Sequence, residues 1–242
     1  MTERILHHDV VVMQPGYMPW LGYFDLACLA DDFVIYDDVQ FDKGGWRNRN
    51  RILNGAGPLW LTVPIVHRHP QEIRNVRIAD TVWQAKHLRS IAQLYRRAPC
   101  FDEVFPMISR YLNGKRYDWL VDLCVTGHRV FCDLLGVVGR MHLSSELDIP
   151  KSGRTERLVE ICRRFGASRY VSPDASAAYM GQDLWTAAGI ELVYQRYPHP
   201  RYRQWETEFV SHLSIVDALM FAGVTAVRGW TGISHGKVRD GV

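Results

Sequence analysis

Residues 10–13, VVVM, form an unbroken apolar run of mostly β-branched side chains directly after Asp9. A strand with one face in water alternates apolar and polar residues, so this run predicts a strand over 9–13 that is buried on both faces. Strands of this kind occur mainly in parallel sheets whose two faces are covered by helices. The first element therefore already indicates an α/β protein.

The last third of the chain indicates the same architecture. Predicted strands alternate there with predicted helices, in a βαβαβ order typical of parallel strands joined by helical crossovers. The strands are expected over 140–147, 168–173 and 190–197, and the helices over 155–166 and 182–189.

The first third adds a second strand over 32–41 and a hairpin. The hairpin is predicted from residues 46–52 and 58–66, because the Asn54-Gly55 pair between them is a strong turn signal. Residues 73–79 are expected to form a further edge strand.

The middle of the chain is predicted to be helical over 80–98, 101–112 and 117–137, where apolar residues recur at helical spacing. We therefore expect a mixed, largely parallel sheet flanked by helices, with residues 81–139 as a helical insertion. No linker-like composition divides the chain, so residues 1–242 are predicted to form a single α/β domain.

Composition and motifs exclude several classes of function. The formal net charge of +3 is too small to indicate nucleic-acid binding. The sequence has no apolar run of the roughly 18 residues that a membrane span needs and no signal peptide, so we expect a cytoplasmic protein. It also lacks a P-loop, a GxGxxG motif, an HExxH motif and zinc-type cysteine spacing. No metal and no bound cofactor are predicted.

The loop after the first strand is expected to be rigid and aromatic. Its sequence, MQPGYMPWLGYF over 13–24, contains two prolines that fix the backbone and one strongly polar side chain, Gln14. Gln14 is expected to point outward, toward a substrate. Tyr17 and Trp20 are expected either to wall the same pocket or to anchor the loop in the core.

Polar residues follow two of the predicted strands. Asp37, Asp38 and Gln40 emerge at the carboxyl end of the second strand, where open α/β sheets bind ligands. The alternative is an acidic turn that caps a helix or pairs with arginines. Ser144 and Ser145, in the segment SSEL, are expected either to cap a helix or to offer hydroxyls to a ligand.

Arginine and asparagine alternate in the segment WRNRNR, residues 46–51. In an extended strand Arg47 and Arg49 lie on one face and Asn48 lies on the other. Arginine forks bind phosphate or carboxylate, and asparagine amides suit sugar or amide groups, so this weave is a candidate ligand site. The alternative is a solvated strand edge.

Two histidines are candidate proton acceptors. His87 lies four residues after Trp83 on a predicted helix, and is either a core histidine or a general base. His199 lies between two prolines in the segment YQRYPHPRYRQW, with Tyr202 close by. Rigid aromatic segments of this kind either line pockets or form surface loops.

These segments together resemble the WbqC-like protein family. QPGYMPWLGYF, FVIYDDVQF, WRNRNRI, WLTVP, Trp83 with His87, and SSEL occur in the order typical of that family, and the resemblance spans residues 10–223. It implies a biosynthetic enzyme that transfers an acyl or aminoacyl group, such as glycyl, onto an amine of a sugar or natural-product intermediate. It also implies that the donor is an acyl or peptidyl carrier-protein thioester, linked through phosphopantetheine.

Roles can be assigned to the candidate residues under this expectation. Amide formation from a thioester needs a positioned amine, a base and a partner for the oxyanion. We expect His87 or His199 to be the base and Asp38 to orient it. Gln14 and Asn48 are expected to form hydrogen bonds to the carbonyl oxygen, and the arginines of the weave to hold a phosphate. Cys100 is the alternative, covalent nucleophile.

Two other functions remain open. A nucleotidyltransferase-like or nucleotide-sugar-binding protein would hold phosphates in a loop between a strand and a helix N-terminus, which is where residues 13–24 lie. A non-catalytic partner in a biosynthetic assembly would use exposed aromatic residues as interface anchors. A homodimer is compatible with each of these functions.

Overall fold

A computed structural model of the chain describes residues 7–80, 82–174, 180–205 and 208–232. Five strands form a parallel sheet in the order β7-β2-β1-β8-β9. These strands are β1 (Asp9–Met13), β2 (Asp32–Ile35), β7 (Arg140–Leu143), β8 (Arg169–Pro173) and β9 (Glu191–Gln195). The prediction of an α/β fold with a largely parallel sheet is confirmed.

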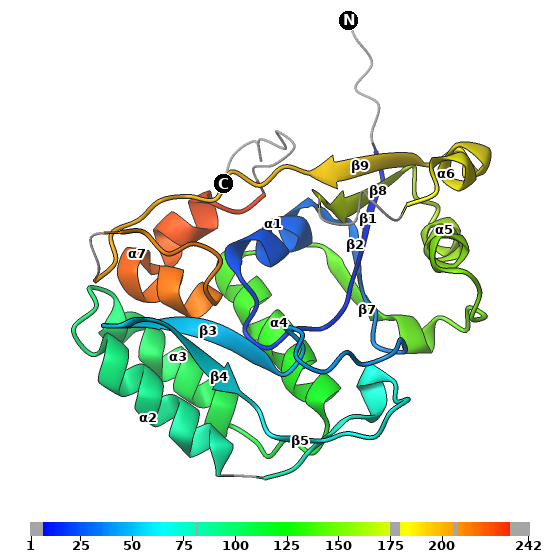
Figure 1. Ribbon diagram of the computed structural model, residues 1–242. Coiled ribbons are helices and arrows are strands. Elements are labelled where there is room, and N and C mark those ends of the chain that lie inside the picture. Colours follow the sequence, from blue (N-terminus) through cyan, green and yellow to red (C-terminus); the bar gives the residue numbers. More distant parts are fainter. Residues whose placement is uncertain (1–6, 81, 175–179, 206–207, 233–242) are drawn as a thin grey trace, which may run out of the picture.

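Helices cover both faces of this sheet, which is why its first strand is apolar throughout (Figure 1). Val11 of β1 packs into the larger core, whereas Val10 and Val12 pack into the smaller one, because successive side chains of a strand point to opposite faces. The larger core is shared with α1 (Leu21–Leu29), α4 (Leu120–Leu135) and α7 (Ile215–Gly229), and the smaller one with α5 (Arg154–Arg164) and α6 (Gln182–Ala188).

The inserted helices lie in the middle of the chain as predicted. They are α2 (Trp83–Tyr95), α3 (Phe101–Asn113) and α4. The hairpin of β3 (Arg49–Asn54) and β4 (Gly57–Thr62) forms a separate antiparallel sheet that lies beside α2 and α3 in Figure 1. A second small sheet pairs β5 (Ile65–Val66) with β6 (Arg77–Ile78), next to a 3-10 turn, η1 (Ile73–Asn75).

Several predicted strands are shorter than the sequence pattern indicates. The strand expected over 58–66 divides into β4 and β5, and the edge strand expected over 73–79 is η1 followed by the two-residue β6. Two strands of the main sheet lose their polar ends. β2 ends at Ile35 instead of continuing to residue 41, and β7 ends at Leu143, where a 3-10 turn, η2 (Ser144–Glu146), begins. The backbone N–H of Asp37 donates to Ser144 Oγ at 3.1 Å rather than to a neighbouring strand. Side-chain contacts between these two strand ends therefore replace the ladder, and the predicted strand tails become polar loops.

The strand order fixes where a ligand crevice can lie. Taken in chain order, the sheet runs third, second, first, fourth, fifth, so the connections that leave β1 and β8 turn to opposite sides. Open parallel sheets bind ligands at the carboxyl ends of the strands where such a reversal occurs. In this fold that position is the edge where β1, β2 and β8 end.

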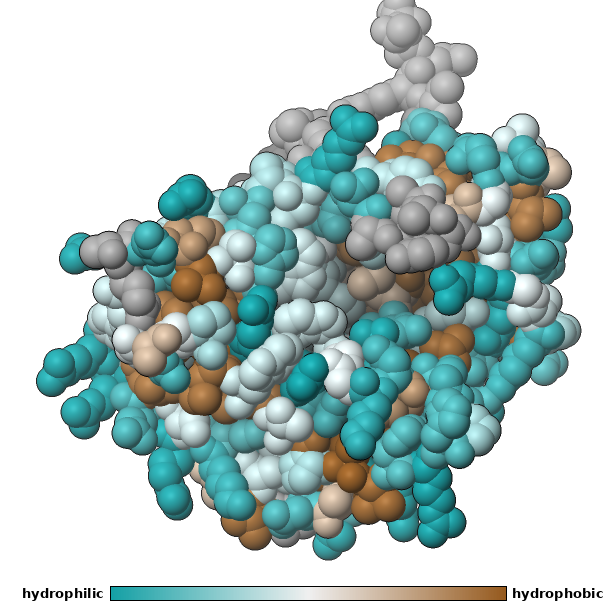
Figure 2. Space-filling model, viewed as in Figure 1, coloured by the Kyte–Doolittle hydropathy of each residue, from teal (hydrophilic) through white to brown (hydrophobic). Residues whose placement is uncertain are grey.

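Hydrophobic residues on the face shown in Figure 2 form small patches among hydrophilic ones. Within the described residues, none of the helices combines the length and the apolar character needed to cross a membrane.

Candidate functional site

A cleft of about 790 Å³ opens at the predicted edge of the sheet. We call it the polar cleft. Its walls come from the residue after β1, from the segment after β2, from residues 70–72 and from the start of α5. The residues that matter for its chemistry are Gln14, Asp38, Gln40, Arg47, Lys151 and Arg157.

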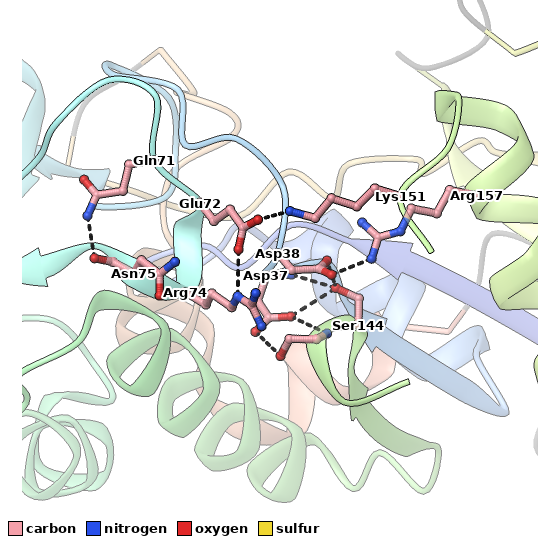
Figure 3. A network of polar contacts seen from close by, with 10 residues as sticks. Asp37, Asp38, Gln71, Glu72, Arg74, Asn75, Ser144, Lys151 and Arg157 are labelled. Carbon is pink, nitrogen blue, oxygen red and sulfur yellow. Dashed lines mark hydrogen bonds and ion pairs between the residues drawn. The ribbon is translucent and has the colours of Figure 1, made fainter. Parts of the chain in front are cut away.

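A buried ion pair forms one wall of the polar cleft (Figure 3). The side chains of Asp38 and Arg157 are only 8% and 4% exposed, and Arg157 donates to Asp38 while its guanidinium lies 5.1 Å from the Tyr36 ring. Burial by itself raises the pKa of the Asp38 carboxyl, but the hydrogen bonds from Arg157 and Ser144 outweigh it, so the pKa lies below its ordinary value. Asp38 therefore remains an anion near neutral pH.

The two serines of η2 hold the acids of the β2 end in place. Ser144 Oγ lies 2.5 Å from Asp38 Oδ1 and 3.0 Å from Asp37 Oδ1. Ser145 donates to Asp37 through both its backbone N–H, at 3.0 Å, and its hydroxyl, at 2.7 Å. Asp37 and Ser144 are buried, and neither they nor Ser145 line the polar cleft, so in this geometry these groups position Asp38.

The rim of the polar cleft carries further charged groups. Lys151 donates to Glu72, which also accepts from Arg74 Nε at 2.7 Å (Figure 3). Ser152 and Arg154, at the start of α5, line the same cleft. Since a helix N-terminus favours negative charge, this side of the cleft is suited to an anionic group.

A second cavity, of about 260 Å³, adjoins the polar cleft. Its walls are mainly Met13, Pro15, Pro19, Trp20, Tyr23 and Trp46. We call it the aromatic cavity. Gln14 and Arg47 line both spaces, so they form the junction between a charged compartment and an apolar one.

Both junction residues carry a buried polar atom without a hydrogen-bond partner among the described residues. These atoms are Gln14 Oε1, an acceptor, and Arg47 Nε, a donor. Arg47 Nε lies 3.1 Å from Asp42 Oδ1 as an ion pair, but the N–H is not aimed at that oxygen. Burial lowers the pKa of Arg47 below its ordinary value. A ligand that offers one donor and one acceptor would satisfy both groups.

The loop that carries Gln14 is held by hydrogen bonds from residues outside the main sheet. Met18 has a φ of 43°, in the left-handed region that L residues avoid. Its carbonyl accepts from Asn50 Nδ2 at 2.7 Å and from Ser214 Oγ at 2.8 Å, and the Tyr17 carbonyl accepts from Asn50 Nδ2 at 3.1 Å. These bonds hold the strained conformation.

Tyr17 and Trp20 have different roles. Tyr17 is buried in the core, where its hydroxyl lies 2.8 Å from His87 Nδ1 and its ring packs edge-on against Trp83. Trp20 lines the aromatic cavity. Of the two alternatives, Tyr17 therefore anchors the loop and Trp20 walls the pocket.

His87 lies away from both spaces, in the interior. It is 7% exposed, and burial lowers its pKa from 6.5 to about 4. It lines neither the polar cleft nor the aromatic cavity. The geometry favours the core-histidine alternative over the general base.

His199 does not line the aromatic cavity but packs against Trp20, one of its walls, whereas His212 lines the cavity directly. The ring of His199 stacks on Trp20 with 6.0 Å between ring centroids, and its Nε2 accepts from the backbone N–H of His212 at 3.2 Å. Burial lowers the pKa of His199. His212 is exposed, lines the cavity and has a φ of 57°. Sequence reasoning missed His212, because its place beside Trp20 and His199 is set by tertiary packing and not by a local pattern.

Tyr202 belongs to a hydrogen-bond network outside the two spaces, whereas Gln40 lines the polar cleft. The Tyr202 hydroxyl donates to Asp217 at 2.8 Å, and the buried Asp217 also accepts from Tyr95 at 2.7 Å and Gln204 at 2.8 Å. This network ties the segment that bears the two histidines to α7. Gln40 lines the polar cleft, and its amide donates to the Phe41 carbonyl at 3.0 Å.

Asn48 and Arg49 are separated from the junction. Asn48 is buried and donates to the Val63 carbonyl at 2.9 Å, and both residues line a different cavity beside the hairpin. Gln14 and Asp38 therefore share the polar cleft as expected, but Asn48 does not join them. Burial raises the pKa of Cys100, and this residue lines neither space. Within the described residues, no group of three or more metal-binding side chains could hold a metal ion.

Comparison with known proteins identifies the family. The model of the WbqC-like protein family matches residues 14–229. The chain belongs to the WbqC-like family. A relative from Mycobacterium tuberculosis, the uncharacterised protein Rv1507c, is 33% identical over 220 residues, which cover 90% of this chain and 95% of the relative. No solved structure matches the chain. The matched region includes Gln14, Asp38 and Arg47, but neither the family description nor the relative names a reaction.

Proposed function

We propose that this WbqC-like protein is an amide-forming acyl or aminoacyl transferase whose reaction takes place at the junction of the polar cleft and the aromatic cavity. The observation that carries the proposal is the pair of unsatisfied groups at that junction, Gln14 Oε1 and Arg47 Nε. An attacking amine supplies the N–H that Gln14 lacks. A thioester carbonyl supplies the acceptor that Arg47 lacks.

The reaction can be written on these groups. The amine nitrogen forms a C–N bond to the thioester carbon, and Arg47 Nε donates a hydrogen bond to the oxyanion that develops on the carbonyl oxygen. His212, at the aromatic cavity, takes the proton that the amine loses. The C–S bond then breaks, and the departing thiolate receives that proton as it leaves as a thiol.

The basic side of the polar cleft fits a donor that carries phosphate. Lys151, Arg154 and the N-terminus of α5 line one part of the cleft, and the junction that the acyl group must reach lines another. A phosphopantetheine arm is a long chain with a phosphate at one end and a thioester at the other. An acyl or peptidyl carrier protein is therefore the proposed donor, and a small amine of a sugar or natural-product intermediate is the proposed acceptor.

Variants of the junction test this function in an assay of acyl transfer from a carrier-bound thioester to an amine. Arg47→Gln removes the donor to the oxyanion, and we expect kcat/KM to fall about 100-fold to 1,000-fold. His212→Asn removes the base, and we expect a fall of about 100-fold or more. His7→Asn is the matched control, because His7 is exposed and precedes β1, at the opposite end of the sheet. Full activity of both junction variants would refute the proposed roles.

A second candidate function is the binding of a nucleotide-linked substrate, such as a nucleotide-sugar. The observation that favours it is the strand order, third-second-first-fourth-fifth, which doubly wound dinucleotide-binding sheets share. Thermal unfolding in the presence of millimolar UDP-sugar, ATP or CTP distinguishes the two functions. A rise in melting temperature with a nucleotide, and none with a pantetheine thioester, would favour this second function.

A further inference from the structure

A third cavity lies beside the hairpin, outside the site described above. It has a volume of about 330 Å³, and Phe41, Lys43, Arg49, Thr62, Ile65 and His67 line it. It shares no lining residue with the polar cleft or the aromatic cavity. We call it the hairpin cavity. Its volume is in the range of small-molecule sites.

The charge of the hairpin cavity is of one sign. Lys43 and Arg49 contribute two cations, His67 contributes an imidazole, and no aspartate or glutamate is among its lining residues in the described part of the chain. The polar cleft differs, since Asp38, Asp42 and Glu72 balance its cations there. An anion would therefore enter the hairpin cavity without meeting a carboxylate.

Arg49 is held in one orientation. Its guanidinium lies 4.2 Å from the centroid of the Trp60 ring and donates through one terminal nitrogen to the Gly44 carbonyl. Gly44 has a φ of 89°, which only glycine adopts without strain. Arg49 Nε is nevertheless buried without a hydrogen-bond partner among the described residues. A fixed guanidinium with an unused donor is prepared to bind an oxyanion.

His67 adds a second unused group. Its ring centroid lies 4.9 Å from that of Phe41, and its Nε2 is a buried atom without a hydrogen-bond partner within the described residues. Two buried polar atoms of this kind in residues that line one small cavity are uncommon, because each unsatisfied group costs stability. Phe41 and Ile65 leave an apolar wall beside them.

We propose that the hairpin cavity binds a small organic anion. Arg49, Lys43 and His67 hold its phosphate or carboxylate group, and Phe41 and Ile65 contact a short apolar portion. Such a ligand binds apart from the transfer site, so the proposal does not depend on the reaction inferred for that site.

Titration of the full-length protein with inorganic phosphate and, separately, with acetate tests the proposal. Isothermal titration calorimetry gives the affinity, and the imidazole signals of His67 in NMR spectra, assigned with His67→Asn, report the place of binding. We expect saturable binding of at least one of these anions with movement of the His67 signals. Tighter binding of phosphate would identify a phosphate ester as the ligand class, and tighter binding of acetate a carboxylate.

Arg49→Gln is expected to weaken this binding about tenfold or more. Arg51→Gln is the matched control: Arg51 follows on the same strand and also lies over Trp60, at 5.7 Å, but it does not line the hairpin cavity. Lys43→Ala, at an exposed position, provides a second variant that does not disturb the hairpin, and is expected to weaken binding in the same direction. Absence of binding, equal loss in both arginine variants, or binding that leaves the His67 signals unmoved would overturn the proposal.

Discussion

At the scale of single residues, the ion pair between Asp38 and Arg157 is the most strongly constrained feature of the candidate site. Both side chains are buried, so each charge depends on the other, and the Ser144 hydroxyl adds a further hydrogen bond to the Asp38 carboxylate. Removing one member of such a pair leaves an uncompensated buried charge.

Asp38→Asn is therefore expected to lower the free energy of unfolding by about 3 kcal/mol. The matched control is Asp118→Asn, because Asp118 forms an exposed ion pair with Arg116 and its loss is expected to change stability by less than about 1 kcal/mol. Urea unfolding at pH 7 measures both. Equal effects of the two substitutions would show that burial does not strengthen the Asp38 pair.

The sequence predicted that Asp38 and Gln14 belong to one site, because both follow strands that end at the same edge of a parallel sheet. It did not predict the partner Arg157, which lies 119 residues further along the chain. The same limit applies to His212. Contacts between residues so far apart in the chain depend on how α5 and the segment before α7 pack in the fold. No local sequence pattern indicates them.

At the scale of elements, the loop over 14–20 depends on the hairpin. Asn50, on β3, donates to two successive carbonyls of that loop and faces inward, whereas Arg49 and Arg51 face the aromatic rings on the outer side. The alternation was predicted for a strand over 46–52, but β3 begins at Arg49, so it holds only for Arg49, Asn50 and Arg51. Arg47 and Arg49 do not share a face as predicted, since Arg47 lines the polar cleft while Asn48 and Arg49 line another cavity. What the tertiary structure decided is that the asparagine face is buried, so these amides support the backbone instead of a ligand.

Asn50→Ala is expected to destabilise the protein by about 1–3 kcal/mol, because it leaves buried carbonyls of Tyr17 and Met18 short of a donor. Asn113→Ala is the control, since Asn113 is exposed at the end of α3 and its loss is expected to stay within about 0.5 kcal/mol. Urea unfolding compares them. The loop would be independent of the hairpin if Asn50→Ala were as stable as the control.

At the scale of the whole molecule, two buried histidines link stability to pH. Burial lowers the pKa of His87 and of His128 from 6.5 to about 4, and each ring accepts or donates one hydrogen bond to a core tyrosine, Tyr17 or Tyr23. Between pH 6.5 and 4 the unfolded chain binds protons at these positions and the folded chain does not. Stability is therefore fully present above pH 6.5 and falls as the pH drops toward 4.

Each histidine is expected to contribute a loss on the order of 3 kcal/mol across this window. The measurement is the free energy of unfolding in urea as a function of pH. His87→Asn is expected to make the slope between pH 6.5 and 4 shallower, while the control His7→Asn, at an exposed position, leaves it unchanged. An unaltered slope in His87→Asn would show that His87 binds its proton equally well in both states.

The sequence by itself determined the class of fold, the parallel sheet, the inserted helices and the family, because strand and helix periodicities, turn residues and an ordered set of motifs are all local signals. Only the tertiary structure decided which polar residues meet. In the folded chain Gln14 and Arg47 lie at one junction, and His212 lines the aromatic cavity. His87 and Asn48 are buried in the interior. The physical reason is that burial and long-range hydrogen bonding assign a side chain its role, and both depend on elements far apart in the chain.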